Sequence, residues 1–290
     1  SLSNIMEISI HDQNPPLFLS LLHYWLKIFG VNAFAAKAFS VFLSILTAIV
    51  LFLFSEKFLT RKTAILVSIM ILFSSTQLYY AHEARTFTLV EFLCVLSFWL
   101  YMEILLRPRL IKVFGYTIIG IAMLMSHYLS VFVLLSQFIC SFLFLFKNRK
   151  GFWYQFCGFV LLGLIFLPWL PVLARNIPEN GKGWLLSPGL NQLYYALDNL
   201  ADGKMFRYLY SGIIASTIVI ILIRKVKLFF VQDFKVYWVL ILVSWLVVPV
   251  MVDYIVSQYT PVFLTRYLLY ASLGLLLSVA YIITHLRTVA

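Results

Sequence analysis

The sequence predicts an all-α, polytopic membrane protein: a bundle of about nine spans with a further helix at the membrane surface. Three observations predict this class. The 290 residues are 63% hydrophobic and only 11% charged, which is more apolar surface than a soluble domain can bury. The apolar residues form continuous helix-length segments instead of alternating, which excludes an outer-membrane barrel. The basic residues gather in a few short loops, as the positive-inside rule requires.

Nine apolar segments are predicted to be spans. They are residues 37–59, 63–80, 86–106, 113–125, 129–146, 152–173, 205–223, 236–256 and 266–284. No internal repeat or linker divides them, so residues 1–290 are predicted to form a single transmembrane domain. Residues 1–36 are predicted to be an outer loop with an interfacial helix. Residues 174–204 form a long outer loop with a short helix at 190–200.

The interfacial helix is predicted at residues 17–29, directly after Pro15 and Pro16. Proline is tolerated at the start of a helix and disfavoured inside one. Polar residues recur at a spacing of three and four, which places Ser20, His23 and Lys27 on one stripe. Such a helix is only ~20 Å long, short of the ~30 Å hydrocarbon core. We therefore expect it to lie along the membrane surface.

The basic loops assign the two sides of the bundle. Fourteen of the 22 Lys and Arg lie at residues 57–62, 107–112, 147–150, 224–235 and 285–290. These loops and the adjoining span ends hold few of the 11 acidic residues. The basic side is thus predicted to be cytoplasmic, which explains the net charge of +11 without a nucleic-acid partner. The opposite, outer face then carries Asp12, His82, Glu83, Arg85, His127 and Arg266.

Two polar clusters near the predicted outer face are the first candidates for chemistry. Asp12 and Asn14, before the proline pair, would either cap the following helix or supply a metal ligand or a substrate-orienting carboxylate. Glu83 and Arg85 would either form a solvated turn whose charges pair locally, or serve a site. Glu91 is a lone carboxylate inside a span, which indicates a polar cavity or a partner within the bundle.

Two further clusters come later in the chain. His127 and Tyr128 separate two predicted spans. His127 is either a structural residue or part of a site shared with His11, His82 and Asp12, although no zinc-binding spacing is present. Arg266, at the start of the last span, would either snorkel to the interface or hold a phosphate at a lipid-facing cavity. There is no Walker loop and no nucleophile elbow, so nucleotide-driven chemistry is not predicted.

The order of these motifs resembles that of the GT-C-fold glycosyltransferases. Asp12 and Asn14-Pro15-Pro16-Leu17 resemble the Asp-x-His-Pro-Pro-Leu segment of the family, which includes protein O-mannosyltransferases and lipid A aminoarabinose transferases. The segment from Tyr80 to Phe87 is similar to the family's Ser-Gln-Glu-Ala-Arg-Met-Tyr segment. Two further landmarks follow in the same order, His127-Tyr128 and Arg266-Tyr267-Leu268-Leu269. The resemblance extends over nearly the whole chain.

The resemblance implies a membrane glycosyltransferase of the cell envelope. Such an enzyme would move a sugar from a polyprenyl-phosphate donor to a glycan, lipid or protein acceptor. Its site would face the non-cytoplasmic side of a bacterial inner or plasma membrane. The motif matches imply catalytic roles for Asp12, Glu83 and Arg85. They imply substrate binding by Arg266, Tyr267, Asn14, His127 and Tyr128. A divalent metal of unspecified identity is implied at Asp12.

Two departures from the family leave other functions open. Asn14 replaces the family's histidine, which weakens a metal site at that position. The family also has one more N-terminal span, followed by an acidic residue, so this chain is expected to lack its first span and that acid. The alternatives are a flippase or transporter for a lipid-linked substrate, and a non-catalytic subunit of an envelope-assembly complex.

Overall fold

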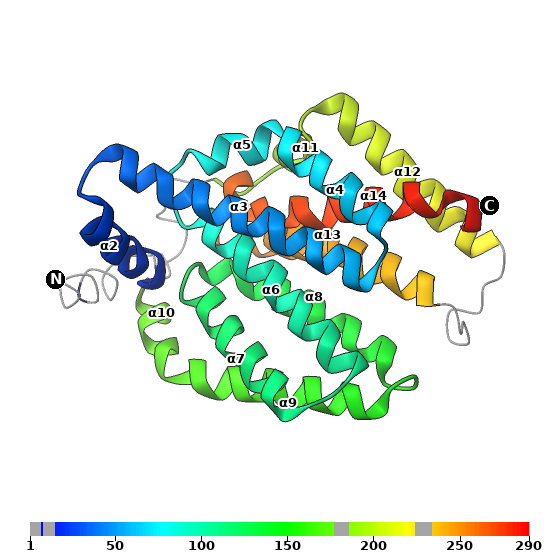
Figure 1. The fold of residues 1–290 in the computed structure, drawn as a ribbon, viewed down its shortest axis with the longest axis horizontal. Helices are drawn as coiled ribbons and strands as arrows, with labels where there is room; N and C mark the ends of the chain where they lie inside the picture. The colour runs from blue at the N-terminus through cyan, green and yellow to red at the C-terminus, as the bar shows by residue number, and fades with distance from the viewer. Residues whose placement is uncertain (1–6, 8–14, 177–185, 224–233, 290) are drawn as a thin grey trace.

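The computed structural model describes residues 7, 15–176, 186–223 and 234–289, and this part of the chain consists of helices and their connections, without strands (Figure 1). The α-helices are α2 (Leu17–Phe29), α3 (Ala33–Phe58), α4 (Arg61–Phe73), α5 (Ser75–Ala81), α6 (Phe87–Leu106), α7 (Leu110–Leu124), α8 (Val131–Ser141), α9 (Arg149–Phe166), α10 (Leu170–Asn176), α11 (Leu190–Leu200), α12 (Lys204–Ile223), α13 (Phe234–Val256) and α14 (Leu269–Val289). The 3-10 turns are η1 (Tyr128–Ser130), η2 (Phe142–Phe144), η3 (Leu167–Trp169) and η5 (Thr265–Leu268). The predicted all-α class is confirmed.

The predicted count of nine spans is not supported by helix length. Within the described ranges, five helical segments are long and apolar enough to cross a membrane, and the bent pair α4 and α5 would make a sixth. The five are Ala33–Phe58, Phe87–Leu106, Arg149–Arg175, Tyr237–Val256 and Thr265–His285. Helix α7 has only 15 residues, or ~22 Å, less than the ~30 Å hydrocarbon core. The apolar segment Tyr128–Phe144 is also short.

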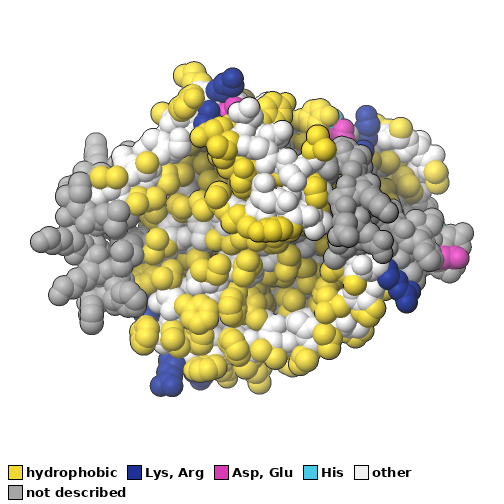
Figure 2. Space-filling view, turned by 180° about the vertical axis from the view of Figure 1, so that it is seen from behind, with side chains coloured by type: hydrophobic (Ala, Val, Ile, Leu, Met, Phe, Trp, Pro, Cys, Tyr) yellow, Lys and Arg dark blue, Asp and Glu magenta, His cyan; other side chains and the backbone are white. Residues whose placement is uncertain are grey.

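Helices α6 and α14 form the centre of the bundle. Most of each is buried, 67% of the apolar window of α6 and 83% of that of α14, against 17% for the span that contains α9 and α10. Helix α6 is apolar around its whole circumference because other helices surround it. Phe98 of α6 stacks on Trp245 of α13 with ring centroids 3.7 Å apart. The remaining helices expose apolar side chains, which cover the middle of the face in Figure 2.

The helix connections gather at two ends of the bundle. At one end, Glu103 of α6 contacts Lys57 of α3 and Lys112 of α7. Asn148, before α9, donates a hydrogen bond to the Leu105 carbonyl at the same end, with a length of 2.6 Å. We call this the basic end, because the connections at residues 57–62, 107–112 and 147–150 meet there. The prediction that these loops share one side agrees with this arrangement.

The opposite end is formed by other connections. The Leu17 amide donates to the Met125 carbonyl at 3.0 Å, which fixes the start of α2 to the end of α7. The Thr86 hydroxyl donates to the Ser126 carbonyl at 2.8 Å, which fixes the start of α6 to the same place. The connections before α2, before α6 and after α7 therefore lie together, and Tyr267, before α14, joins them with its ring 6.0 Å from that of Phe87.

Helix α2 has the predicted bounds and packs on α3. Phe18 is buried, and its ring lies 5.7 Å from that of Phe39. Trp25 lies 5.3 Å from the same ring and donates from Nε1 to the Ala35 carbonyl at 2.9 Å. Its other side exposes large apolar side chains, among them Ile28 at 75%. Together with the polar stripe of Ser20, His23 and Lys27, these exposed apolar side chains make α2 amphipathic, as a helix at a membrane surface needs to be.

The predicted span at residues 63–80 is broken, which the sequence analysis missed. Helices α4 and α5 meet at Ser74 with a bend of 63°. Asp202, between α11 and α12, accepts hydrogen bonds at the bend from Ser74 Oγ at 3.0 Å, Ser75 Oγ at 3.0 Å and Thr76 N at 2.8 Å. Its carboxylate thereby binds the amide and hydroxyl groups that the start of α5 leaves unpaired.

Candidate functional site

A pocket of about 420 Å³ lies at the end of the bundle opposite the basic end. Four segments that are distant in sequence line it. They are Pro15, Phe18 and Leu19 of the α2 start, Ala84, Arg85, Thr86 and Phe87 before and at the start of α6, Ser126 and His127 after α7, and Arg266 and Tyr267 of η5. The structure thus brings four predicted site residues, Arg85, His127, Arg266 and Tyr267, to one cavity.

The two arginines of the pocket differ in their partners. Arg85 forms an ion pair with Glu83, with Nε 3.4 Å from Oε2, and both side chains are partly exposed. Arg266 is half-buried, and its Nε is buried without a hydrogen-bond partner among the described residues. Its guanidinium lies over the Tyr267 ring, 5.3 Å from the centroid. A buried N–H group without an acceptor is unfavourable, so Arg266 is a ready donor for an anionic ligand.

His127 is held in the pocket wall by aromatic rings. Its ring lies 4.7 Å from Tyr267 and 6.3 Å from Phe87, centroid to centroid. Its Nδ1 accepts from the Leu129 amide at 3.3 Å, which places the proton of the neutral ring on Nε2. Burial, and then the charge of Arg266, lower the pKa of His127 to about 4. At neutral pH the pocket therefore contains a neutral imidazole beside the guanidinium.

A second cavity, of about 560 Å³, is lined mostly by apolar side chains. Tyr128 lines it, and the other lining residues come from α7, α8 and the α9–α10 span, nearly all of them Leu, Val or Phe. The Tyr128 hydroxyl accepts a hydrogen bond from Trp169 Nε1 at 3.0 Å. His127 lines the polar pocket, and the next residue, Tyr128, lines the apolar cavity. The same short backbone segment therefore contributes to both.

Several predicted residues lie elsewhere. Asp12, Asn14 and His11 are outside the described residues, although Pro15, which follows them, lines the pocket. Glu83 reaches the site only through Arg85. His82 is exposed and bonds through Nδ1 to the Leu78 carbonyl of its own helix at 2.7 Å, so it is not part of the described lining.

Two buried carboxyl groups lie inside the bundle. Glu91 of α6 has the partner that its position predicted. Gln77 Nε2 donates to Glu91 Oε1 at 2.7 Å and to Ser272 Oγ at 2.8 Å. This bridge joins α5, α6 and α14, the three helices whose ends carry Glu83, Phe87 and Arg266. Asp253 of α13 is fully buried. It was not predicted from the sequence, although a lone acid within a span is the same signal that identified Glu91.

The described lining does not form a metal site. The lining residues include one imidazole and no carboxylate, and the imidazole lies beside a guanidinium. No group of three or more His, Cys, Asp or Glu side chains among the described residues is arranged to hold a metal ion. The divalent metal at Asp12 therefore stays a prediction.

Comparison with known proteins places the fold. Neither a family model nor a curated protein sequence matches this chain. Two solved structures match: ArnT from Cupriavidus metallidurans in the apo state, with a TM-score of 0.58, and ArnT bound to undecaprenyl phosphate, with a TM-score of 0.59. Each is 15% identical and covers 92% of this chain. The chain spans about half the length of those proteins, 49% and 50%.

At this level of identity, the likeness is evidence of fold and not of activity. ArnT has the GT-C fold, and this chain accordingly has a GT-C-like fold.

Proposed function

We propose that this chain transfers a sugar from a polyprenyl-phosphate donor to an acceptor, with the lipid phosphate bound at Arg266. The observation that carries the proposal is the buried Nε of Arg266, which has no hydrogen-bond partner in the described part of the chain and lies in a pocket lined by His127, while the next residue, Tyr128, lines a larger apolar cavity. A polyprenyl-phosphate donor has the same division into an anionic group and a long apolar chain. The undecaprenyl phosphate bound to ArnT makes this class of ligand a natural choice.

The chemistry of transfer explains why a cation is needed. The bond between the sugar's anomeric carbon and the phosphate oxygen breaks, and a bond to the acceptor oxygen forms. The acceptor hydroxyl gives up its proton to solvent, and the phosphate changes from a diester to a monoester with an additional negative charge. Arg266 would stabilise that charge through fixed donors. Tyr267 packs beneath the guanidinium, and the ion pair of Glu83 with Arg85 would orient a second cation toward the pocket.

The remaining implied roles follow from the family motifs. Asp12 and Asn14 lie outside the described residues and precede Pro15 in the sequence, and Pro15 lines the pocket. We propose that Asp12 orients the acceptor hydroxyl, or a divalent metal beside it. His127 and Tyr128 would contact the donor where its head group joins its chain. The sugar and the acceptor, whether glycan, lipid or protein, are open.

The topology belongs to the same proposal. The basic end would face the cytoplasm, and the pocket the non-cytoplasmic side of a bacterial inner or plasma membrane. Short as they are, α7 and the Tyr128–Phe144 segment connect the two ends of the bundle. All nine predicted segments would then cross, with α2 at the surface, if the bilayer is locally thinner beside the short helices.

The proposal is tested by measuring binding of undecaprenyl phosphate to the full-length protein in detergent. Arg266→Gln removes charge-assisted bonds of about 1.5–3 kcal/mol, so we expect affinity to fall roughly ten- to a hundredfold. Arg149→Gln, at the basic end, is the matched control and leaves affinity unchanged. Asp12→Asn keeps binding and loses transfer of sugar from a polyprenyl-phosphate donor. Unchanged binding in Arg266→Gln would refute the site.

The bent span supplies the one observation that favours a rival. Interrupted helices are typical of transporters, and α4 and α5 together form an interrupted helix. In a flippase, a polyprenyl-linked sugar would change leaflets in proteoliposomes without cleavage of its glycosidic bond. In a non-catalytic envelope-assembly subunit, neither cleavage nor movement would occur, and an active partner would co-purify.

A further inference from the structure

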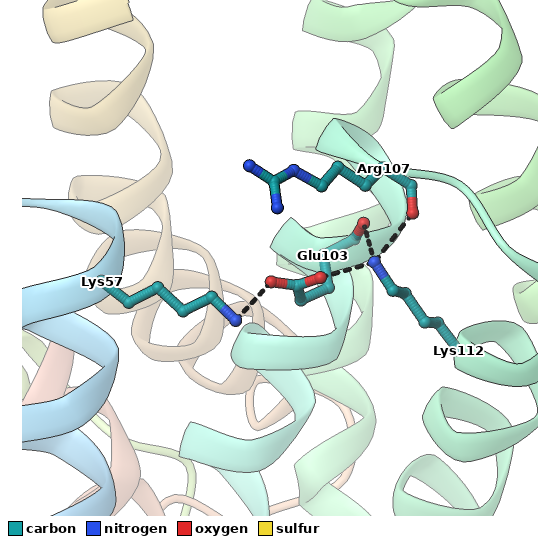
Figure 3. A network of polar contacts seen from close by, with 4 residues as sticks. All are labelled: Lys57, Glu103, Arg107 and Lys112. Atoms are coloured by element: carbon teal, nitrogen blue, oxygen red, sulfur yellow. Dashed lines mark hydrogen bonds and ion pairs between the residues drawn. The ribbon is translucent and has the colours of Figure 1, made fainter.

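The basic end contains a charge cluster that the proposed transferase site does not use. Glu103 lies between two lysines, with Oε1 2.6 Å from Lys57 Nζ and Oε2 2.5 Å from Lys112 Nζ (Figure 3). The Glu103 side chain is only 14% exposed. One carboxylate therefore fixes cations from α3 and α7 at the end of α6.

The cations of this cluster are not equally satisfied. Lys112 uses all three of its donors, because Nζ also contacts the backbone carbonyls of Glu103 at 3.3 Å and Arg107 at 2.9 Å. Lys57 has Glu103 as its acceptor, lies 4.9 Å from the Trp99 ring centroid, and remains 45% exposed. Among the described residues, no hydrogen bond or ion pair holds the exposed Arg107 guanidinium. In Figure 3 it extends toward the side from which Lys57 approaches.

The cluster of Lys57, Glu103, Arg107 and Lys112 therefore carries a net positive charge at the basic end of the bundle. Three cations surround one carboxylate, and that carboxylate has both oxygens occupied by lysine. The groups that can still donate hydrogen bonds to a ligand are the Arg107 guanidinium and the exposed side of the Lys57 ammonium. A guanidinium fork matches the oxygens of a phosphate group.

An apolar stripe leads along α3 to Lys57. Phe42, Ile45, Ile49 and Leu53 are spaced by three and four residues, so they share one face of the helix. All four are exposed, at 43%, 54%, 50% and 44%. Lys57 follows Leu53 by four residues on the same face. A membrane-facing stripe that ends in a cation fits an amphiphile with an anionic head group better than it fits a free ion.

We propose that the basic end binds an anionic phospholipid, with its phosphate held by Arg107 and Lys57 and an acyl chain along the Phe42–Leu53 stripe. Basic pockets between transmembrane helices are known to bind anionic lipid head groups. Glu103 positions Lys57 for the phosphate and does not compete for Arg107. The site is independent of sugar transfer.

The test uses the full-length protein in detergent and native mass spectrometry of bound lipid. The probes are dioleoyl phosphatidylglycerol and dioleoyl phosphatidylcholine, with inorganic phosphate as a competitor. We expect phosphatidylglycerol to bind about tenfold more tightly than phosphatidylcholine, because both carry the phosphate but Arg107 and Lys57 repel the ammonium group of choline. Arg107→Ala removes this preference. Arg109→Ala, an exposed arginine two residues away, is the matched control and keeps it.

Several results would overturn the proposal. If Arg107→Ala and Arg109→Ala lost the lipid preference equally, the preference would come from the overall positive charge of this end and not from a defined site. Absence of preference in the wild-type protein would exclude the anionic head group. Displacement of the lipid by millimolar inorganic phosphate would show that the stripe contributes nothing. Lys57→Gln, which keeps a donor for Glu103, should also weaken the preference, and wild-type binding in that variant would remove Lys57 from the site.

Discussion

Asp202 is the residue whose replacement tests how the broken span is held. Its Oδ1 accepts three hydrogen bonds at the bend, and its φ of 62° lies in the left-handed region. Loss of bonds to a charged acceptor costs about 1.5–3 kcal/mol, and the low end applies because Asp202 is partly exposed. The left-handed backbone costs Ala roughly a further 1–2 kcal/mol, whereas Gly and Asn adopt it readily.

Three variants separate these two effects. We expect Asp202→Ala to destabilise the protein by about 3 kcal/mol and Asp202→Gly by about 1.5 kcal/mol. Asp202→Asn should cost less than about 1 kcal/mol, because asparagine keeps an oxygen acceptor and tolerates this backbone.

The measurement is thermal unfolding in one detergent, followed by intrinsic fluorescence. Each kcal/mol shifts Tm by about 2–4 °C. Equal losses in the Ala and Gly variants would refute the backbone contribution. An Asn variant as unstable as the Ala variant would refute the acceptor role.

Two further predictions concern packing and pH. Gly151→Ala would place a Cβ 2.4 Å from the Leu105 carbonyl oxygen and should cost about 1–3 kcal/mol. Gly163→Ala, in the same helix with nothing within 4 Å, is the control and should be neutral or stabilising by thermal unfolding. The pKa of His127 is about 4 in the folded protein, against 6.5 for the free side chain, so the unfolded chain takes up the proton first as pH falls. The stability that this residue contributes is present above pH 6.5 and is lost toward pH 4. Acidification from pH 7 to 5 should therefore lower Tm more in the wild type than in His127→Gln, and identical pH profiles would contradict this.

Local signals in the sequence predicted most of the helices. The bounds of α2 follow from the Pro15-Pro16 pair before it and Gly30 after it. The start of α11 follows Gly189 in the same way. The bend at Ser74 had no such signal, because neither Pro nor Gly is present there. It depends on Asp202, 128 residues away, and sequence spacing does not report a contact of that range.

The sequence predicted on which face of the bundle the candidate site lies and in which order its motifs occur along the chain. It predicted the chemistry of the site only in part. Charge in the loops placed Arg85, His127 and Arg266 on one face, and the structure places them in one pocket. Local pairing of Glu83 with Arg85 was one of the two interpretations of that segment, and the ion pair agrees with it. The burial of Arg266 Nε without a described partner could not be predicted, because it depends on tertiary packing. The apolar cavity beside Tyr128 was also missed, since its leucines and phenylalanines read as ordinary span residues.

The attachment of α2 has a mechanical consequence. Phe18 and Leu19 form part of the pocket wall, yet the helix that carries them exposes a broad apolar surface and is pinned to α7 by one backbone bond, from Leu17 to Met125. A displacement of α2 by the surrounding lipid would therefore change the aperture of the cavity directly. Access of a ligand to Arg266 would then depend on how α2 is seated at the membrane surface.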